Sequence, residues 1–300
     1  MKTLKKFVAI LMAAMLLLAF SSCDLIEDAA TTPIVGTITD ENGVETEVNG
    51  IKAKEIRIGI LYSEDFEKEE TQAHVHSKAI ETMMGTYGIA GIITKNKIDV
   101  TNKQKIDDSI ISCVKESGCN VVLSTDPAFT EAMYKFSQDP GYKNIAFTCL
   151  DSTGNYESTE NFNCFYPAYE EAYALAGIVA ASKGSSSITL TDENASYADA
   201  FALGAKAVNP SVKVINGEKL DTYGTLVTNW YVYYMTLVEK LTLGTFDDMG
   251  NYNEGIKTGF CDFSANEDYS SDEIEDKLSD ARLALNEGTW DLAKAETIKF

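Results

Sequence analysis

The side chains best suited to hold a small polar molecule follow short apolar runs, at the points where those runs end. These segments are Ser63–Phe66, Thr125–Asp126, Asp151–Ser152 and Asp192–Asn194. Ligands of open α/β sheets bind outside the carboxyl ends of the strands, so we expect these segments to line a cleft. Carboxylates accept hydrogen bonds from the hydroxyl groups of a ligand, and an aromatic pair, Phe129 and Trp230, can hold a planar group between two rings.

The same residues have a purely structural interpretation. Aspartates are common turn formers, and Trp230 can be a core or hinge aromatic. The two histidines, His74 and His76, lie two residues apart in a predicted helix, where they point to different faces, so a zinc pair is disfavoured. The sequence contains no Ser-His-Asp order, HExxH motif or phosphate-binding glycine loop, so we predict no enzyme activity, metal or cofactor.

Strands and helices alternate through most of the chain. Ile188–Thr191 is a predicted strand, Asp192–Ser196 a polar turn, and Tyr197–Val208 a helix ended by Pro210. The same alternation covers Ile56–Leu61, Thr71–Tyr87, Lys103–Glu116, Asn120–Ser124, Ala128–Gln138 and Asn144–Leu150. It predicts a parallel, doubly wound α/β sheet.

The later elements are less regular. The helix Ala168–Ser182 is rich in Ala and Gly, which allows close approach of a neighbouring backbone. Leu226 is expected to lead straight into a helix ending near Gly244. A weak strand, Gly255–Phe263, precedes a final helix whose apolar stripe is Ile274, Leu278, Ala281 and Leu285.

The first residues resemble a targeting segment. Lys2, Lys5 and Lys6 precede an apolar run, Phe7–Phe20, that is short for a membrane span. Ser21 and Ser22 before Cys23 resemble a lipoprotein processing site, which predicts a lipidated Cys23; the alternative is an ordinary secretory signal. Both interpretations place the chain outside the cytoplasm. The net charge of −21 argues against nucleic-acid binding.

The remaining cysteines are Cys113, Cys119, Cys149, Cys164 and Cys261. Their number is odd and no CxxC motif occurs, so neither a zinc knuckle nor a full disulfide framework is indicated. We expect Cys113 and Cys149 to be small core residues.

Three ordered segments resemble the basic membrane lipoprotein, or PnrA-like, family of nucleoside receptors of ABC transporters. They are Ala168–Ala181, Ala200–Val214 and Leu226–Phe246, and Ala73-His74 and Leu285–Asp291 also fit. The resemblance implies a type I periplasmic-binding-protein fold, with a ligand clamped between two α/β lobes, and no catalysis. Together with the strand-end residues named above, it gives the predicted ligand-binding set Asp65, Phe66, His74, Thr125, Asp126, Phe129, Asp151, Asp192, Asn194, Asn229 and Trp230.

The chain departs from this family in two places. The loop after the first strand offers only Asp65 and Phe66 as equivalents of the family's base-binding residues. Between Ile215 and Leu226, about one and a half βαβ units are absent. The expected organisation is a signal peptide over 1–22, a lipidated tether with a β-hairpin over 23–54, a first lobe over 55–162 plus about 231–300, and a truncated second lobe over 163–230.

Two functional hypotheses follow. The first is a membrane-anchored, extracytoplasmic solute-binding lipoprotein that delivers a purine nucleoside or nucleobase to an ABC permease. The second is a surface lipoprotein that keeps the scaffold, has lost the pocket and acts through protein contacts. An extracytoplasmic enzyme is a distant third, because no acid–base pair is evident.

Overall fold

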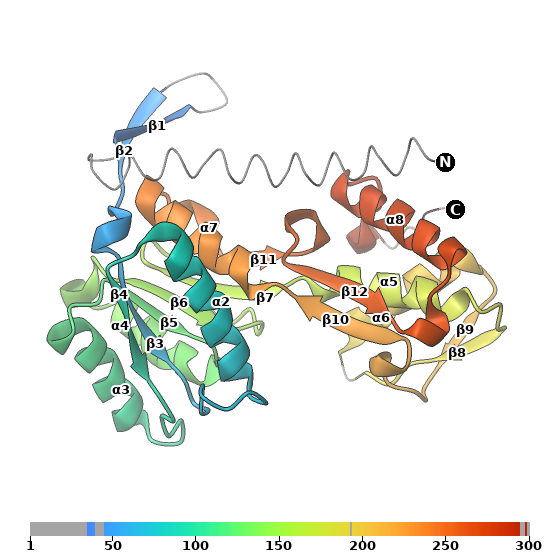
Figure 1. The fold of residues 1–300 in the computed structure, drawn as a ribbon, viewed down its shortest axis with the longest axis horizontal. Helices are drawn as coiled ribbons and strands as arrows, with labels where there is room; N and C mark the ends of the chain where they lie inside the picture. Colours follow the sequence, from blue (N-terminus) through green and yellow to red (C-terminus); the bar gives the residue numbers. More distant parts are fainter. Residues whose placement is uncertain (1–34, 40–44, 193, 295–297, 299–300) are drawn as a thin grey trace. The chain divides into compact units, whose positions relative to one another are not determined.

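The structure is a computed structural model that describes residues 35–39, 45–192, 194–294 and 298. The expected signal peptide and Cys23 lie outside the described residues. The strands are β1 (Val35–Thr39), β2 (Glu45–Asn49), β3 (Arg57–Leu61), β4 (Gly91–Lys95), β5 (Val121–Ser124), β6 (Ala146–Leu150), β7 (Phe162–Pro167), β8 (Ser187–Thr189), β9 (Lys213–Ile215), β10 (Gly224–Thr228), β11 (Tyr252–Glu254) and β12 (Cys261–Ala265) (Figure 1). The α-helices are α2 (Gln72–Tyr87), α3 (Lys103–Ile111), α4 (Thr130–Ser137), α5 (Tyr169–Ala181), α6 (Ala195–Val208), α7 (Trp230–Leu243) and α8 (Asp272–Asn286).

The chain divides into two compact units. The first contains the described residues up to Cys164 together with Tyr234–Asn251, and the second contains Phe165–Tyr233 and the described residues from Tyr252 onward. The strands β1 and β2, where the sequence predicts a hairpin, pair antiparallel.

A parallel sheet forms the centre of the first unit. In the first unit the strands follow the order β7-β6-β5-β3-β4, where β7 contributes Phe162–Cys164, and β3, β4, β5 and β6 pair in parallel. From Phe165 onward β7 belongs to the second unit and pairs with β11. Nearly every residue of β3, β5 and β6 is buried, as expected for strands covered on both faces. Helices α3 and α4 share one core with this sheet, and α2 is tied to α7 by a contact of 2.6 Å between His76 Nδ1 and the Tyr234 hydroxyl. The predicted α/β fold is confirmed.

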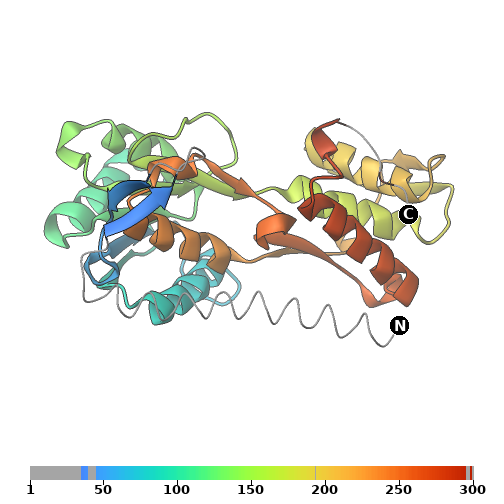
Figure 2. The same ribbon diagram turned by 90° about the horizontal axis from the view of Figure 1, so that it is seen from above.

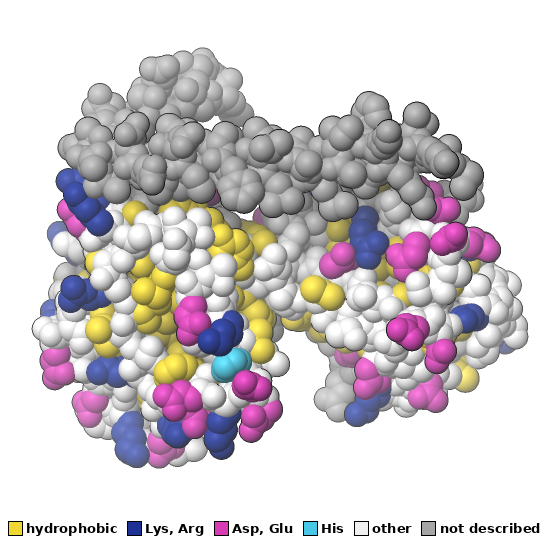
Figure 3. All heavy atoms as spheres, viewed as in Figure 1, with side chains coloured by type: hydrophobic (Ala, Val, Ile, Leu, Met, Phe, Trp, Pro, Cys, Tyr) yellow, Lys and Arg dark blue, Asp and Glu magenta, His cyan; other side chains and the backbone are white. Residues whose placement is uncertain are grey.

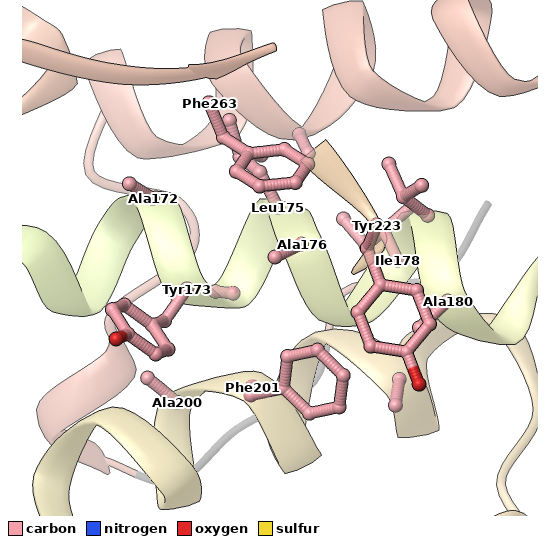
Figure 4. Packing of buried hydrophobic residues seen from close by; sticks show 14 of the residues in the cluster. Ala172, Tyr173, Leu175, Ala176, Ile178, Ala180, Ala200, Phe201, Tyr223 and Phe263 are labelled. Atoms are coloured by element: carbon pink, nitrogen blue, oxygen red, sulfur yellow. The ribbon is translucent and has the colours of Figure 1, made fainter. Parts of the chain in front are cut away.

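The second unit is built around two closely packed helices. A Cβ atom on Gly177 of α5 would lie 2.0 Å from the carbonyl oxygen of Phe201 on α6, so only glycine fits at this crossing. Phe201 and Phe263 lie on opposite sides of α5 (Figure 4), and its residues from Ala172 to Ala181 are buried. This confirms the expected close approach of a neighbouring backbone.

Two small sheets complete this unit. Strands β8 and β9 pair in parallel, and β10 pairs antiparallel with β12 (Figures 1 and 2). The strand β10 was not predicted, because the sequence analysis expected a helix to follow directly from Leu226. The helix α7 begins only at Trp230.

The division of the C-terminal residues also differs from the expected lobe boundaries. The sequence analysis assigned about 231–300 to the first lobe, whereas the structure places Tyr252 onward in the second unit. The physical reason is pairing and burial, since β12 joins β10 and Leu278 of α8 enters the same core as α5. A local sequence pattern does not contain these long-range contacts.

Candidate functional site

The carboxyl edge of the parallel sheet gathers the polar residues expected there. Leu61 at the end of β3 lies opposite Ser124 of β5, which in turn lies opposite Cys149 of β6. The loops that follow these three strands therefore leave the sheet at one edge. They carry Asp65, Asp126 and Asp151, so the structure brings the three predicted aspartates of the first unit to the same side of its sheet.

Asp65 is held in an ion pair. Its Oδ2 lies 2.7 Å from Lys97 Nζ, and its Oδ1 accepts a hydrogen bond of 3.2 Å from Asn96 Nδ2. The hydrogen bond from Lys97 is the main reason that the pKa of Asp65 is lowered to about 2. The carboxyl group is therefore an acceptor at any physiological pH.

Lys97 itself has an unusual backbone. Its φ of 56° places it in the left-handed region, which non-glycine residues rarely adopt. Such conformations occur where surrounding contacts hold them, often at binding sites. The sequence analysis missed Asn96 and Lys97, because it assigned no strand between Tyr87 and Lys103; the pair Ile92-Ile93 of β4 was the available signal.

Phe66 and His74 fix the loop after β3 to helix α2. The Phe66 ring stacks on Tyr62, with ring centroids 5.4 Å apart and 25° between the planes. His74 Nδ1 lies 2.9 Å from the carbonyl oxygen of Phe66. Because a carbonyl oxygen only accepts, Nδ1 carries the proton, and Nε2 of the neutral ring is an acceptor. Both side chains are half-buried, as a ligand wall requires.

Asp126 bridges two loops of the same edge. Its Oδ1 accepts from the backbone N–H of Ala128 at 2.8 Å, and its Oδ2 accepts a short hydrogen bond from the hydroxyl of Ser63. The preceding residue, Thr125, is half-buried. Asp151 is only 4% exposed, and its Oδ1 accepts from the N–H of Thr153 at 2.7 Å. These aspartates are therefore turn formers that also retain acceptor capacity.

The two predicted stacking aromatics are core residues. Phe129 is 0% exposed and packs in the core of the first unit. Trp230 is 7% exposed and packs edge-on against Phe165 and Phe260 in the second unit. The expectation that they present open ring faces was wrong, because each ring packs against residues that other segments of the chain bring into its core. The neighbouring Asn229 is exposed, and its N–H donates to the carbonyl oxygen of Phe260.

A second polar group lies in the second unit. Asp192 accepts from the Tyr173 hydroxyl at 2.5 Å and from the N–H of Asn194 at 2.8 Å. The Asn194 side chain caps α6 through the N–H of Ser196. A cavity of about 540 Å³ adjoins Asp192, and its lining includes Tyr173, Thr191, Lys219, Asp221 and Leu226.

The tyrosines near Asp192 were missed by the sequence analysis. Tyr173 stacks on Tyr197 with centroids 4.7 Å apart, and Tyr169 meets Tyr197 edge-on. Tyr169 and Tyr173 are four residues apart in α5 and so share one helix face, which was the signal in the sequence.

The described residues hold no group of three His, Cys, Asp or Glu side chains that could bind a metal ion. His74 and His76 point to different partners, Phe66 and Tyr234, as helical spacing predicts. Within the same residues, every helix is too short or too polar to cross a bilayer. Acidic side chains are spread over the face drawn in Figure 3, with Lys and Arg among them.

Comparisons with solved structures show the fold. A protein titled as a transcriptional activator of the comK gene from Bacillus halodurans is 12% identical, with a TM-score of 0.62 over 78% of this chain and 99% of that one. An ABC transporter solute-binding protein from Conexibacter woesei is 12% identical, with a TM-score of 0.57 over 79% and 98%. Another from Aeropyrum pernix is 9% identical, with a TM-score of 0.57 over 78% and 92%.

The sequence comparisons show the family. A search of curated proteins gave no significant match. The family model for PnrA-like substrate-binding proteins of ABC transporters matches residues 56–223, more than half of the chain. These residues include the sheet edge with Asp65, Asp126 and Asp151 as well as the group around Asp192. The chain therefore belongs to the PnrA-like family of ABC transporter substrate-binding proteins.

Proposed function

We propose that the chain binds a purine nucleoside, or a related nucleobase, and delivers it to an ABC permease. The observation that carries the proposal is the acceptor set at the carboxyl edge of the first unit. Asp65 is kept ionised by Lys97, and Asp126 lies at the same edge. Ionised carboxylates only accept, so they suit the hydroxyl donors of a ribose, and the half-buried Phe66 suits a planar base.

Asp126 offers a sharp test because the chain contains a matched turn. Asp139 also precedes a proline, and its Oδ1 accepts from the N–H of Gly141 at 2.8 Å, as Asp126 does from Ala128. Asp139, however, precedes β6 and so lies at the amino end of the sheet, and it is exposed. The two aspartates share a local geometry and differ in whether they belong to the proposed site.

The experiment is calorimetric titration of the mature chain with inosine, adenosine, guanosine, cytidine, uridine and hypoxanthine. We expect a purine nucleoside to bind, and ligand at 100 times Kd to stabilise the fold by about 2.7 kcal/mol. Asp126→Asn should weaken binding by roughly 10- to 100-fold, since a hydrogen bond to a charged group contributes about 1.5–3 kcal/mol. Asp139→Asn should bind like the wild type. Equal weakening in both variants, or no heat from any compound, would refute the assignment.

We infer that the protein is anchored outside the cytoplasm through a lipidated Cys23. The support is the leader pattern before Cys23 and the family, whose members serve ABC importers. Acyl chains would tether the chain without a membrane span. We expect Cys23→Ser to move the protein from the membrane fraction to the soluble fraction; a variant that stays in the membrane fraction would contradict the anchor.

We also propose that the second lobe is shortened. Its parallel sheet consists of β8 and β9, and the family match ends at 223, next to the expected deletion before Leu226. Ile215 of β9 is 52% exposed, which is unusual for a strand residue of this kind of sheet. If the pocket was lost with these elements, the chain would bind no nucleoside and would self-associate, which gel filtration of the mature protein detects.

A further inference from the structure

Two buried cysteines lie side by side at the end of the helix that leads to β5. Cys113 is in the π-helical turn Ser112–Glu116 that extends α3, and Cys119 comes just before β5. They are 0% and 2% exposed. The backbone N–H of Cys119 donates to the carbonyl oxygen of Cys113 at 3.0 Å, and Gly118, with φ of 68°, makes the reversal between them. This helix-end geometry brings Cys113 and Cys119 close together.

Both sulfur atoms lie against Gly59. A Cβ atom on Gly59, in the inner strand β3, would lie 2.7 Å from Cys113 Sγ and 3.4 Å from Cys119 Sγ. The glycine therefore leaves room for the two sulfurs against the sheet. A residue of any other type would displace them.

The charge environment favours reaction at Cys119. The close approach of the two thiols, with the positive charges of Arg57 and Lys95, lowers the pKa of Cys119, whereas the neighbouring thiol and burial raise the pKa of Cys113. A thiolate is the nucleophile in thiol–disulfide exchange, so Cys119 is the attacking sulfur and Cys113 the resolving one.

We propose that Cys113 and Cys119 form a disulfide bond in the exported protein, with a small-molecule or protein disulfide as the oxidant. The Cys119 thiolate attacks the oxidant RSSR and releases one RSH; the Cys113 sulfur then attacks the mixed disulfide and releases the second. One S–S bond forms, one breaks, and the two thiol protons leave on the two RSH molecules. The proposal rests on the extracytoplasmic location inferred above, where disulfides persist.

The other cysteines differ in their surroundings. Cys149 Sγ lies 3.4 Å from Met133 Sδ, and Cys261 Sγ lies 3.5 Å from the carbonyl oxygen of Ala168. Cys149 and Cys164 lie on the neighbouring strands β6 and β7, and burial raises the pKa of both thiols, which disfavours the thiolate form. We therefore expect these three thiols to stay reduced.

Trypsin separates the proposed partners, which makes the test direct. Lys115 lies between them, so Cys113 falls in the peptide 106–115 and Cys119 in the peptide 116–135, whereas Cys149 and Cys164 share the peptide 144–183. The protein is exported with its leader, its thiols are blocked with iodoacetamide in denaturant, and the digest is analysed by mass spectrometry without reductant. We expect 106–115 and 116–135 as one linked species that dithiothreitol separates.

Three controls test the disulfide, and none of them depends on ligand binding. Cys261→Ser should leave the linked species in place, and Cys119→Ser should remove it and leave Cys113 alkylated. Refolding the wild type with oxidised glutathione should produce the same linkage. Alkylation of both Cys113 and Cys119 in the exported protein, or a bridge confined to the peptide 144–183, would overturn the proposal.

Discussion

Replacing Gly177 by alanine should destabilise the second unit, because the added methyl group meets backbone rather than side chain. The new Cβ atom would lie 2.0 Å from the Phe201 carbonyl oxygen and 2.8 Å from the Ala205 nitrogen, whereas real Cβ contacts essentially never fall under 3.0 Å. Rotamer changes cannot relieve a clash with backbone, so α5 and α6 must separate by about 1 Å. Tightly packed side chains such as Phe201 would lose contact along the crossing.

The magnitude follows from two opposing contributions. Overpacking a core by one methyl group costs about 1–3 kcal/mol, and a backbone clash lies at the upper end of this range. Replacing glycine by alanine in a helix returns about 1 kcal/mol of helix propensity. The expected net loss is therefore about 2 kcal/mol, or roughly 6–12 °C in Tm for a unit of about 120 residues.

Gly85 of α2 provides the matched control. It is also a helical glycine, but an added Cβ atom would meet no atom within 4 Å. Gly85→Ala should therefore stabilise the protein by about 0.5–1 kcal/mol. Urea unfolding followed by circular dichroism measures both variants. A Gly177→Ala protein at least as stable as the wild type would refute the close-crossing argument.

Two further predictions concern protonation. Burial lowers the pKa of His76 to about 3, so the folded chain cannot take up the proton that the unfolded chain takes up below about pH 6.5. The free energy of unfolding should therefore fall by about 1.4 kcal/mol per pH unit from pH 6.5 toward pH 3. His76→Gln should flatten this dependence, as measured by urea unfolding at pH 7 and pH 5. Parallel pH profiles for the two proteins would contradict the assignment. The ion pair with Lys97 lowers the pKa of Asp65 from 3.8 to about 2. The contribution of this ion pair to folding stability should therefore be complete above the unfolded-state pKa of 3.8 and disappear only as the pH falls toward 2. Carboxyl-carbon NMR titration should show this value, and Lys97→Gln should bring the pKa of Asp65 back toward 3.8.

The polar residues that follow strands could be predicted because strand ends are local features. An apolar run of four to six residues followed by Ser, Thr or Asp is visible in the sequence around Leu61, Ser124 and Leu150. Parallel pairing then places those loops at one edge without further information. The direction in which an aromatic ring points does not follow from the neighbouring residues alone. Phe129 and Trp230 were expected to face a ligand, and both are buried, because the core into which each points is formed by residues distant in the sequence.

The sequence by itself determined the alternation of strands and helices, the family, and the close crossing predicted from the Ala and Gly residues of α5. These features depend on short-range periodicity and on side-chain size, which are written in consecutive residues. Only the tertiary structure decided that the residues from Tyr252 onward belong to the second unit, that Lys97 meets Asp65, and that Cys113 meets Cys119 over Gly59. Asp65 and Lys97 lie in different loops, and Gly59 lies on a different strand from the turn that carries both cysteines, so these neighbours come together only when the strands and helices pack into their common cores.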